Sequence, residues 1–146
     1  MTVRHGIRAA AALLFCLALF ACARGNDSPM EVTVLPESVT PTGLTYRVRR
    51  TGESWVFGDE YAIERLADGQ DEPVPELGNN YAFNAIGYLL DPDPPLDSKE
   101  MSVDWTLLYG ELPPGHYRIA KRFSPAKGGV QDEIVLYAEF EIPGTE

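Results

Sequence analysis

The sequence has few of the residues on which most catalytic and metal sites depend. It contains two cysteines, Cys16 and Cys22, and two histidines, His5 and His116. Transition-metal sites are built from clusters of cysteine and histidine, and nucleophilic catalysis needs a serine or cysteine beside a base. Gly128-Gly129 lacks the lysine that follows a phosphate-binding loop. The sequence therefore predicts a protein that is not an enzyme and needs no metal or cofactor.

Positive charge is also scarce. The chain has 12 basic and 22 acidic side chains, and residues 1–21 contain Arg4 and Arg8 but no acidic residue, so the remainder carries a net charge of 10 − 22 = −12. Affinity for nucleic acid comes largely from basic groups that neutralise phosphates. This balance excludes nucleic acid as a partner and disfavours direct binding to an anionic membrane surface.

The N-terminus has the organisation of an export signal. Basic residues precede an apolar run over residues 9–20, which is about half of the ~20 residues that a membrane-spanning helix needs. Leu19-Phe20-Ala21-Cys22 resembles the lipobox of bacterial lipoproteins. The resemblance implies that Cys22 receives a diacylglycerol thioether and becomes the first residue, and two or more acyl chains anchor a protein stably to a membrane. An ordinary signal peptide cut nearby is the alternative.

This interpretation divides the chain into a lipoprotein signal peptide over residues 1–21, a small polar tether over 22–29 and a folded domain over 30–146. It places the domain in the cell envelope, anchored to a bacterial membrane and facing outside the cytoplasm. Cys16 is then discarded and Cys22 acylated, so no disulfide remains and the domain must be held by packing alone.

After residue 29 the apolar residues alternate with period 2, and no period of 3.6 appears. The clearest strands cover residues 44–49 and 134–142. Arg47, Arg49 and Arg50 are expected to face solvent, and Lys121 breaks the apolar pattern of its strand, which predicts a bulge or an exposed strand end. Asp68-Gly69 predicts a hairpin. Further strands are expected at residues 32–34, 55–57, 61–66, 72–75, 81–88 (partly irregular), 101–105 and 117–123.

A stiff corner joins two of these strands, because Pro113-Pro114-Gly115 has the composition of a tight turn. Together with residues 40–45 and 134–142, the stretch 105–118 resembles the bacterial immunoglobulin-like domains of exported lipoproteins. The resemblance covers residues 30–142. It implies an all-β, antiparallel immunoglobulin-like β-sandwich of about seven to eight strands, preceded by a signal-peptide helix, and carries no activity that could be transferred. A small barrel is the alternative fold.

An acidic, proline-rich stretch over residues 91–97 is predicted to be an exposed loop. Asp91, Asp93 and Asp97 are the candidate binding residues, with the edge at 72–75 as a second contact surface. Calcium binding by these aspartates is an alternative. We expect a non-enzymatic module that binds a protein partner, or, alternatively, a β-sandwich inhibitor whose 91–97 loop blocks an exported protease. Six aromatic residues are expected in the core rather than in a ligand groove: Trp55, Phe57, Tyr61, Trp105, Tyr109 and Tyr117.

Overall fold

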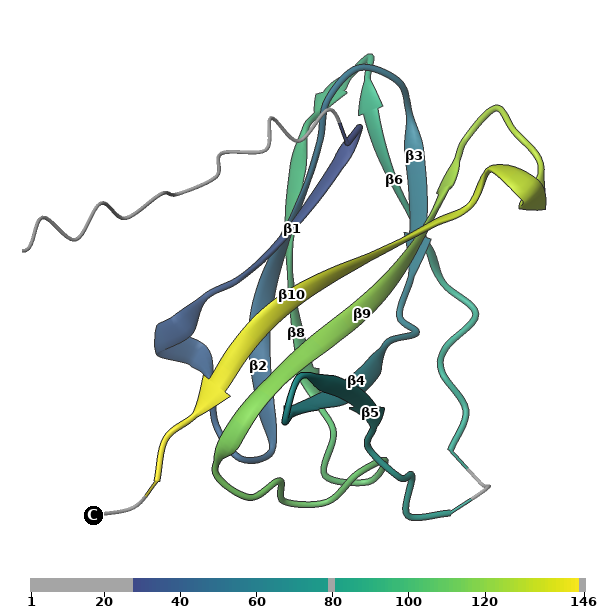
Figure 1. Cartoon of the computed structure of the whole chain (residues 1–146). Helices are drawn as coiled ribbons and strands as arrows, with labels where there is room; N and C mark the ends of the chain where they lie inside the picture. The colour runs from purple at the N-terminus through teal and green to yellow at the C-terminus, as the bar shows by residue number, and fades with distance from the viewer. Residues whose placement is uncertain (1–27, 79–80, 145–146) are drawn as a thin grey trace, which may run out of the picture.

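The computed structural model describes residues 28–78 and 81–144. Within these ranges no helix is long and apolar enough to cross a membrane. The described chain forms ten strands and two short 3₁₀ helices (Figure 1): β1 (Met30–Val34), η1 (Pro36–Ser38), β2 (Gly43–Arg50), β3 (Trp55–Gly58), β4 (Ala62–Ala67), β5 (Gln70–Pro73), β6 (Gly87–Pro92), β7 (Pro95–Leu96), β8 (Ser98–Asp104), β9 (Gly115–Pro125), η2 (Val130–Asp132) and β10 (Ile134–Ile142).

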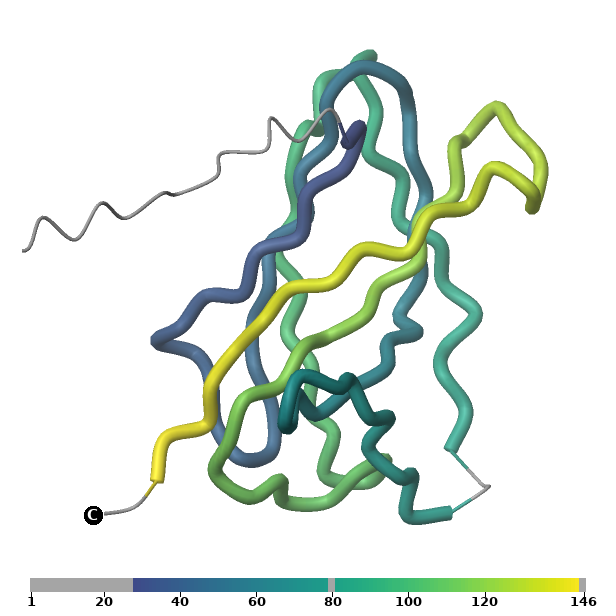
Figure 2. Tube along the Cα trace, in the orientation of Figure 1, coloured from purple at the N-terminus to yellow at the C-terminus, as the bar shows by residue number. Residues whose placement is uncertain are grey.

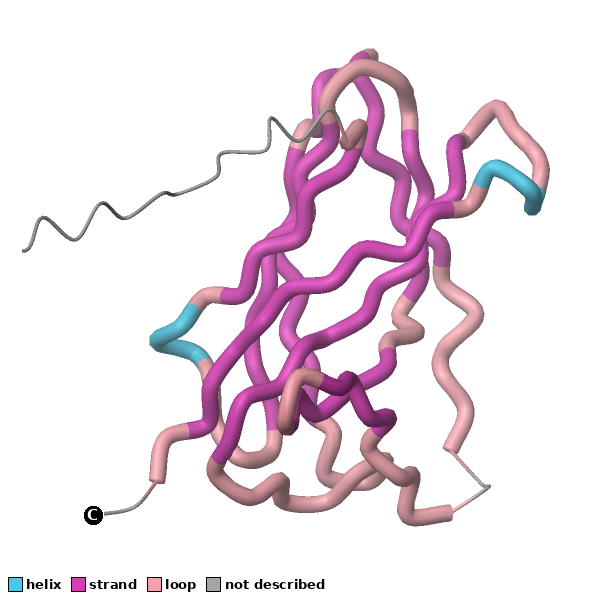
Figure 3. Tube along the Cα trace, viewed as in Figure 1, coloured by secondary structure: helices cyan, strands magenta, loops and turns pink. Residues whose placement is uncertain are grey.

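The strands form two antiparallel sheets that face each other (Figure 3). One sheet has the order β1-β2-β8. The other has the order β5-β4-β9-β3-β6-β7, with β10 paired to β9. This confirms the predicted all-β sandwich. The ten strands exceed the expected seven to eight, partly because the two-residue β7 forms where a loop was predicted.

The long strand β9 organises the larger sheet. One of its edges pairs with β10 throughout, from Gly115 to Phe123. Its other edge pairs first with β4 and then with β3, so these two strands lie end to end with a break at residues 59–61. On one side of the sandwich β1 packs beside β10 (Figure 2). The opposite side is bordered by β8 and by the segment that leads into β6.

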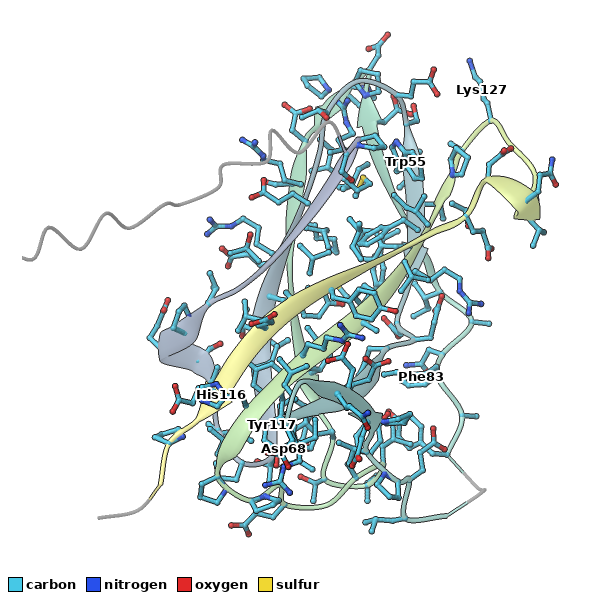
Figure 4. All side chains as sticks on the ribbon, in the orientation of Figure 1. Trp55, Asp68, Phe83, His116, Tyr117 and Lys127 are labelled. Atoms are coloured by element: carbon cyan, nitrogen blue, oxygen red, sulfur yellow. The ribbon has the colours of Figure 1, made fainter. Side chains whose placement is uncertain are left out.

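The predicted core faces are confirmed in the clearest strands. Leu44, Tyr46 and Val48 of β2 are buried, and so are the inward residues at the end of β10. The predicted hairpin is also confirmed, because Asp68 and Gly69 have φ angles of 52° and 76° and join β4 to β5 (Figure 4). These positive angles are those of the two-residue turns that suit a twisted hairpin.

The corner before β9 is structural, as expected. Trp105 is fully buried. The Tyr117 hydroxyl donates a 2.8 Å hydrogen bond to the carbonyl oxygen of Pro113, four residues upstream, which is the tyrosine corner of immunoglobulin-like sandwiches. Figure 4 shows Tyr117 at the start of β9. The corner therefore fixes the entry of the central strand by an aromatic ring and a hydrogen bond together.

The prediction for Lys121 was wrong, because β9 has no bulge there. Lys121 is only 1% exposed and lies among core residues. Its Nζ donates hydrogen bonds of 2.7 and 2.5 Å to the carbonyl oxygens of Gly58 and Glu60. Both carbonyls flank the break between β3 and β4. The prediction from the period-2 pattern assumed that a charged side chain must be solvated by water. Here backbone carbonyl oxygens accept the hydrogen bonds of the ammonium group instead.

Arg50 was also predicted incorrectly, since it is only 7% exposed. Its guanidinium pairs with the carboxylate of Asp97 and donates a 2.6 Å hydrogen bond to the carbonyl oxygen of Gly52. Arg47 and Arg49 do face solvent. They pair with the acidic side chains opposite them on neighbouring strands, Glu100 and Glu31, as is usual for a solvated strand face.

The third difference concerns residues 81–97. Residues 81–86 form no strand, and β6 begins only at Gly87. Residues 91–97 are not an open loop, because β6 and β7 pair through Asp91 with Leu96 and Pro92 with Pro95. The hairpin lies at the end of its sheet, where few ladder donors are needed and proline is tolerated. Its two-residue tip contains a cis peptide bond between Asp93 and Pro94.

Candidate functional site

The three candidate aspartates lie on the β6–β7 hairpin and just after it, but they do not converge on one point. Asp91 Oδ1 accepts the backbone N–H of Asp93 at 2.9 Å, and Asp97 pairs with Arg50. Asp93 is exposed at the tip. Within residues 28–78 and 81–144, no group of three or more histidine, cysteine, aspartate or glutamate side chains is placed to hold a metal ion. Two of the three carboxylates thus have structural partners in the chain.

The predicted edge at residues 72–75 is exposed except for the half-buried Val74. The Val74 N–H donates a 2.9 Å hydrogen bond to the carbonyl oxygen of Ile63. Beside this edge, Leu112 and Tyr117 help to line a shallow groove of about 270 Å³. His116 is a surface residue, as Figure 4 shows, with its Nε2 4.0 Å from a carboxylate oxygen of Glu141. Cys22 lies outside the described residues.

A different set of side chains lines another hollow of the described surface. It has a volume of about 300 Å³ and lies between β8 and the segment 81–88. We call it the aromatic cleft. Five of its lining residues carry aromatic rings: Tyr46, Tyr61, Tyr81, Phe83 and Tyr88. Its polar side chains are Asp59, Asn84, Ser102 and Asp104.

Edge-to-face packing positions the outer wall of the aromatic cleft. The ring centroid of Phe83 lies 5.2 Å from that of Tyr61 and 5.1 Å from that of Tyr81, with interplanar angles of 69° and 79°. Such T-shaped pairs are favourable beyond the area they bury. Figure 4 shows Phe83 directed from the link before β6 toward the body of the sandwich. Packing of rings therefore holds a segment that has no strand pairing.

Hydrogen bonds to Asp59 complete this wall. The Tyr88 hydroxyl donates to Oδ1 at 2.8 Å and the Asn84 side-chain amide donates to Oδ2 at 3.3 Å. The bond to Asp59 raises the pKa of Tyr88. On the opposite wall, the hydroxyl and backbone N–H of Thr106 lower the pKa of Asp104. Asp104 is therefore ionised at neutral pH.

The floor of the aromatic cleft contains Tyr46, which comes from β2 and is fully buried. Among the described residues its hydroxyl has no hydrogen-bond partner. Burial raises the pKa of Tyr46 strongly, and the neighbouring Asp59 and Tyr88 raise it further. The hydroxyl is thus neutral and lies close to the groups that line the cleft.

The six aromatic residues expected in the core are buried, and only Tyr61 among them also lines the aromatic cleft. Sequence reasoning did not find the cleft, because its residues come from four separated segments. One signal was present in the sequence: Tyr81, Phe83 and Tyr88 fit neither a strand nor a helix period. Aromatic side chains that do not follow the alternating pattern of the core strands are candidates for lining a cleft at the side of the sandwich.

Comparison with protein-family models matches residues 27–141 to the model described as "Bacterial Ig-like domain". A comparison with curated proteins and a comparison with solved structures give no match. The matched range contains both sheets, the tyrosine corner and the aromatic cleft. The family model covers most of the sequence and agrees with the antiparallel sandwich, so the chain belongs to the bacterial Ig-like domain family.

Proposed function

We propose that the protein is an exported lipoprotein, anchored through Cys22, that displays a non-enzymatic Ig-like binding domain outside the cytoplasm. Domains of this family are typically non-enzymatic. The observation that carries the proposal is the position of Cys22. It follows a basic and apolar leader directly and precedes the first strand, which begins at Met30, by a short polar stretch. A tether of this length lets a folded domain stand off a lipid surface.

Replacement of the proposed acylated cysteine tests this function. Cys22→Ala should release the protein from membranes or leave it unprocessed, and it should abolish incorporation of labelled palmitate. Cys16→Ala is the matched control, because Cys16 lies in the proposed leader and should leave both readouts unchanged. If the Cys22→Ala protein fractionates, migrates and labels like the parent, the anchor proposal is wrong.

A protein partner is proposed to meet the domain at exposed loops and edges, including the β6–β7 hairpin and the edge at residues 72–75. The net charge of −12 beyond residue 21 favours a basic partner, whose association should slow as salt rises. Asp93→Asn is the cleanest probe of the hairpin, because Asp91 and Asp97 already have structural partners. If the affinity for a basic partner changes neither with salt concentration nor with Asp93→Asn, the partner does not contact the hairpin.

A further inference from the structure

The aromatic cleft contains a buried polar atom that the described structure leaves unsatisfied. The Tyr46 hydroxyl lies at the floor, is shielded from solvent and has no hydrogen-bond partner within residues 28–78 and 81–144. Buried polar atoms nearly always have a partner, and leaving one without is costly. A hydroxyl placed in this way suits a ligand group that brings a donor to it.

The carboxylates of the aromatic cleft form no salt bridge among the described residues. Neither Asp59 nor Asp104 has a basic group within 4.0 Å, whereas six arginine–carboxylate pairs form elsewhere among the described residues. Asp59 uses one acceptor site on each oxygen, and a carboxylate offers about four. Two anionic groups with spare acceptor capacity therefore border a hollow that five aromatic side chains help to line.

Ammonium groups already lie against two rings of this region. Lys99 Nζ is 5.0 Å from the ring centroid of Tyr88, and Lys121 Nζ is 5.6 Å from that of Tyr46. Cations bind favourably over aromatic faces at such distances. Lys121 and Asp59 attract each other without forming a salt bridge, whereas no basic group of the described chain acts on Asp104, so the charge of Asp104 remains available to a cation from outside.

We propose that the aromatic cleft accepts a lysine side chain of a protein partner. The ammonium group has three donors, and three acceptors line the cleft: the Tyr46 hydroxyl and the carboxylates of Asp59 and Asp104. The aliphatic part of a lysine side chain packs on apolar surface while its charge is held by polar groups, and here Tyr81 and Phe83 supply that surface. This inference rests on the proposed binding function and names the chemistry of the partner.

The test uses the full-length protein in detergent and the probe acetyl-Gly-Ala-Lys-Ala-Gly-amide, followed by amide NMR shifts. The lysine peptide should bind saturably and shift amides of residues 81–88 and 101–104. The same peptide with Nε-acetyllysine, which lacks the charge, should bind at least tenfold more weakly. Equal binding of the two peptides would overturn the proposal, and so would saturable shifts confined to other residues.

Matched variants separate this site from general attraction by charge. Tyr46→Phe removes only the unpartnered oxygen, so it should keep or raise the melting temperature while weakening the lysine peptide at least threefold. Asp104→Asn should weaken it at least fivefold. Glu139→Gln removes the same charge from an exposed position of β10, away from the cleft, and should leave binding of the lysine peptide unchanged. The proposal fails if Tyr46→Phe binds like the parent or if Glu139→Gln weakens binding as much as Asp104→Asn.

The peptide experiment and the Cys22 experiment fail independently. Peptide binding does not depend on acylation or location, so a protein that is anchored but does not bind the lysine peptide would overturn only the cleft inference. Lysine binding by a protein that is not anchored would overturn only the envelope proposal.

Discussion

The indole Nε1 of Trp105 donates a 2.9 Å hydrogen bond to the carbonyl oxygen of Pro41, which lies 64 residues earlier in the chain. The backbone N–H of Trp105 donates to the neighbouring carbonyl of Thr42 at 2.8 Å, and the N–H of Leu112 donates to Pro41 as well. The turn before β2 is thereby fixed to the corner before β9. These two stretches are among the three that carry the resemblance to Ig-like domains.

Trp105→Ala should lower the free energy of unfolding by about 3–5 kcal/mol, because it empties a fully buried site and removes the bond to Pro41. Trp105→Phe should cost less but remain clearly destabilising, since it keeps a ring and loses the donor. Leu107 follows in the same corner and is 79% exposed, so Leu107→Ala is the control. Denaturant unfolding measures all three. A Trp105→Ala protein as stable as the parent would place this side chain outside the core.

Gly43 lies directly against the backbone of β8. A Cβ atom at this position would stand 2.3 Å from the carbonyl oxygen of Val103, so the two strands must separate to admit it. We expect Gly43→Ala to cost about 1–3 kcal/mol of unfolding free energy, as overpacked sites do. Gly78 has open space at its Cβ position, and Gly78→Ala should change stability by less than ~0.5 kcal/mol. Equal melting temperatures for the two variants would contradict the close approach.

Strands with clean alternation were predictable from the sequence, and strands that depend on a tertiary partner were not. The inward faces of β2 and β10 follow directly from period-2 patterns. The pairing of β6 with β7 and the burial of Arg50 depend on contacts with other segments of the chain, which the local sequence pattern does not predict. Asp97 lies just after β7 and pairs with the guanidinium of Arg50. This one contact connects the end of the hairpin to β2 and allows the arginine to be buried.

The candidate site was less predictable than the fold. The aspartates of residues 91–97 are candidates because an acidic, proline-rich stretch predicts exposure and negative charge. Asp93 is exposed as expected. The aromatic cleft depends on the distance between sheets and on a break between β3 and β4, which composition does not encode. Tyr46 illustrates the difference. Its position in the alternating pattern of β2 predicts its burial correctly, but the pattern does not predict that its hydroxyl lacks a hydrogen-bond partner among the described residues.

Asp97→Asn should destabilise the domain, because it leaves the buried guanidinium of Arg50 with a neutral partner. Asp97 is itself largely exposed, so we expect a moderate loss of about 1–3 kcal/mol. Asp93→Asn removes an equal charge from the tip of the same hairpin and should change stability by less than ~0.5 kcal/mol. Thermal unfolding of the two proteins side by side distinguishes the pair from a general effect of charge. Equal changes would show that the Arg50–Asp97 contact contributes nothing.

Lys121 should make stability depend on pH in the alkaline range. Burial lowers its pKa from 10.5 to about 8, against a smaller raising effect of Glu60 and Asp59. Between these values the unfolded chain keeps a proton that the folded chain has released, so the unfolding free energy rises with pH. The contribution of Lys121 alone is roughly 2 kcal/mol between pH 8 and pH 10. At still higher pH the unfolded tyrosines lose protons that the buried Tyr46 and Tyr61 retain, and stability falls again.

Lys121→Met should abolish the rise between pH 8 and pH 10 and leave the fall above pH 10 intact, because that fall belongs to the tyrosines. Lys127 is an exposed lysine in the loop after β9 (Figure 4), so Lys127→Met should behave like the parent across the whole range. Urea unfolding at closely spaced pH values measures the three curves. A Lys121→Met curve with the same slope as the parent from pH 8 to pH 10 would show that the buried ammonium group does not control stability there.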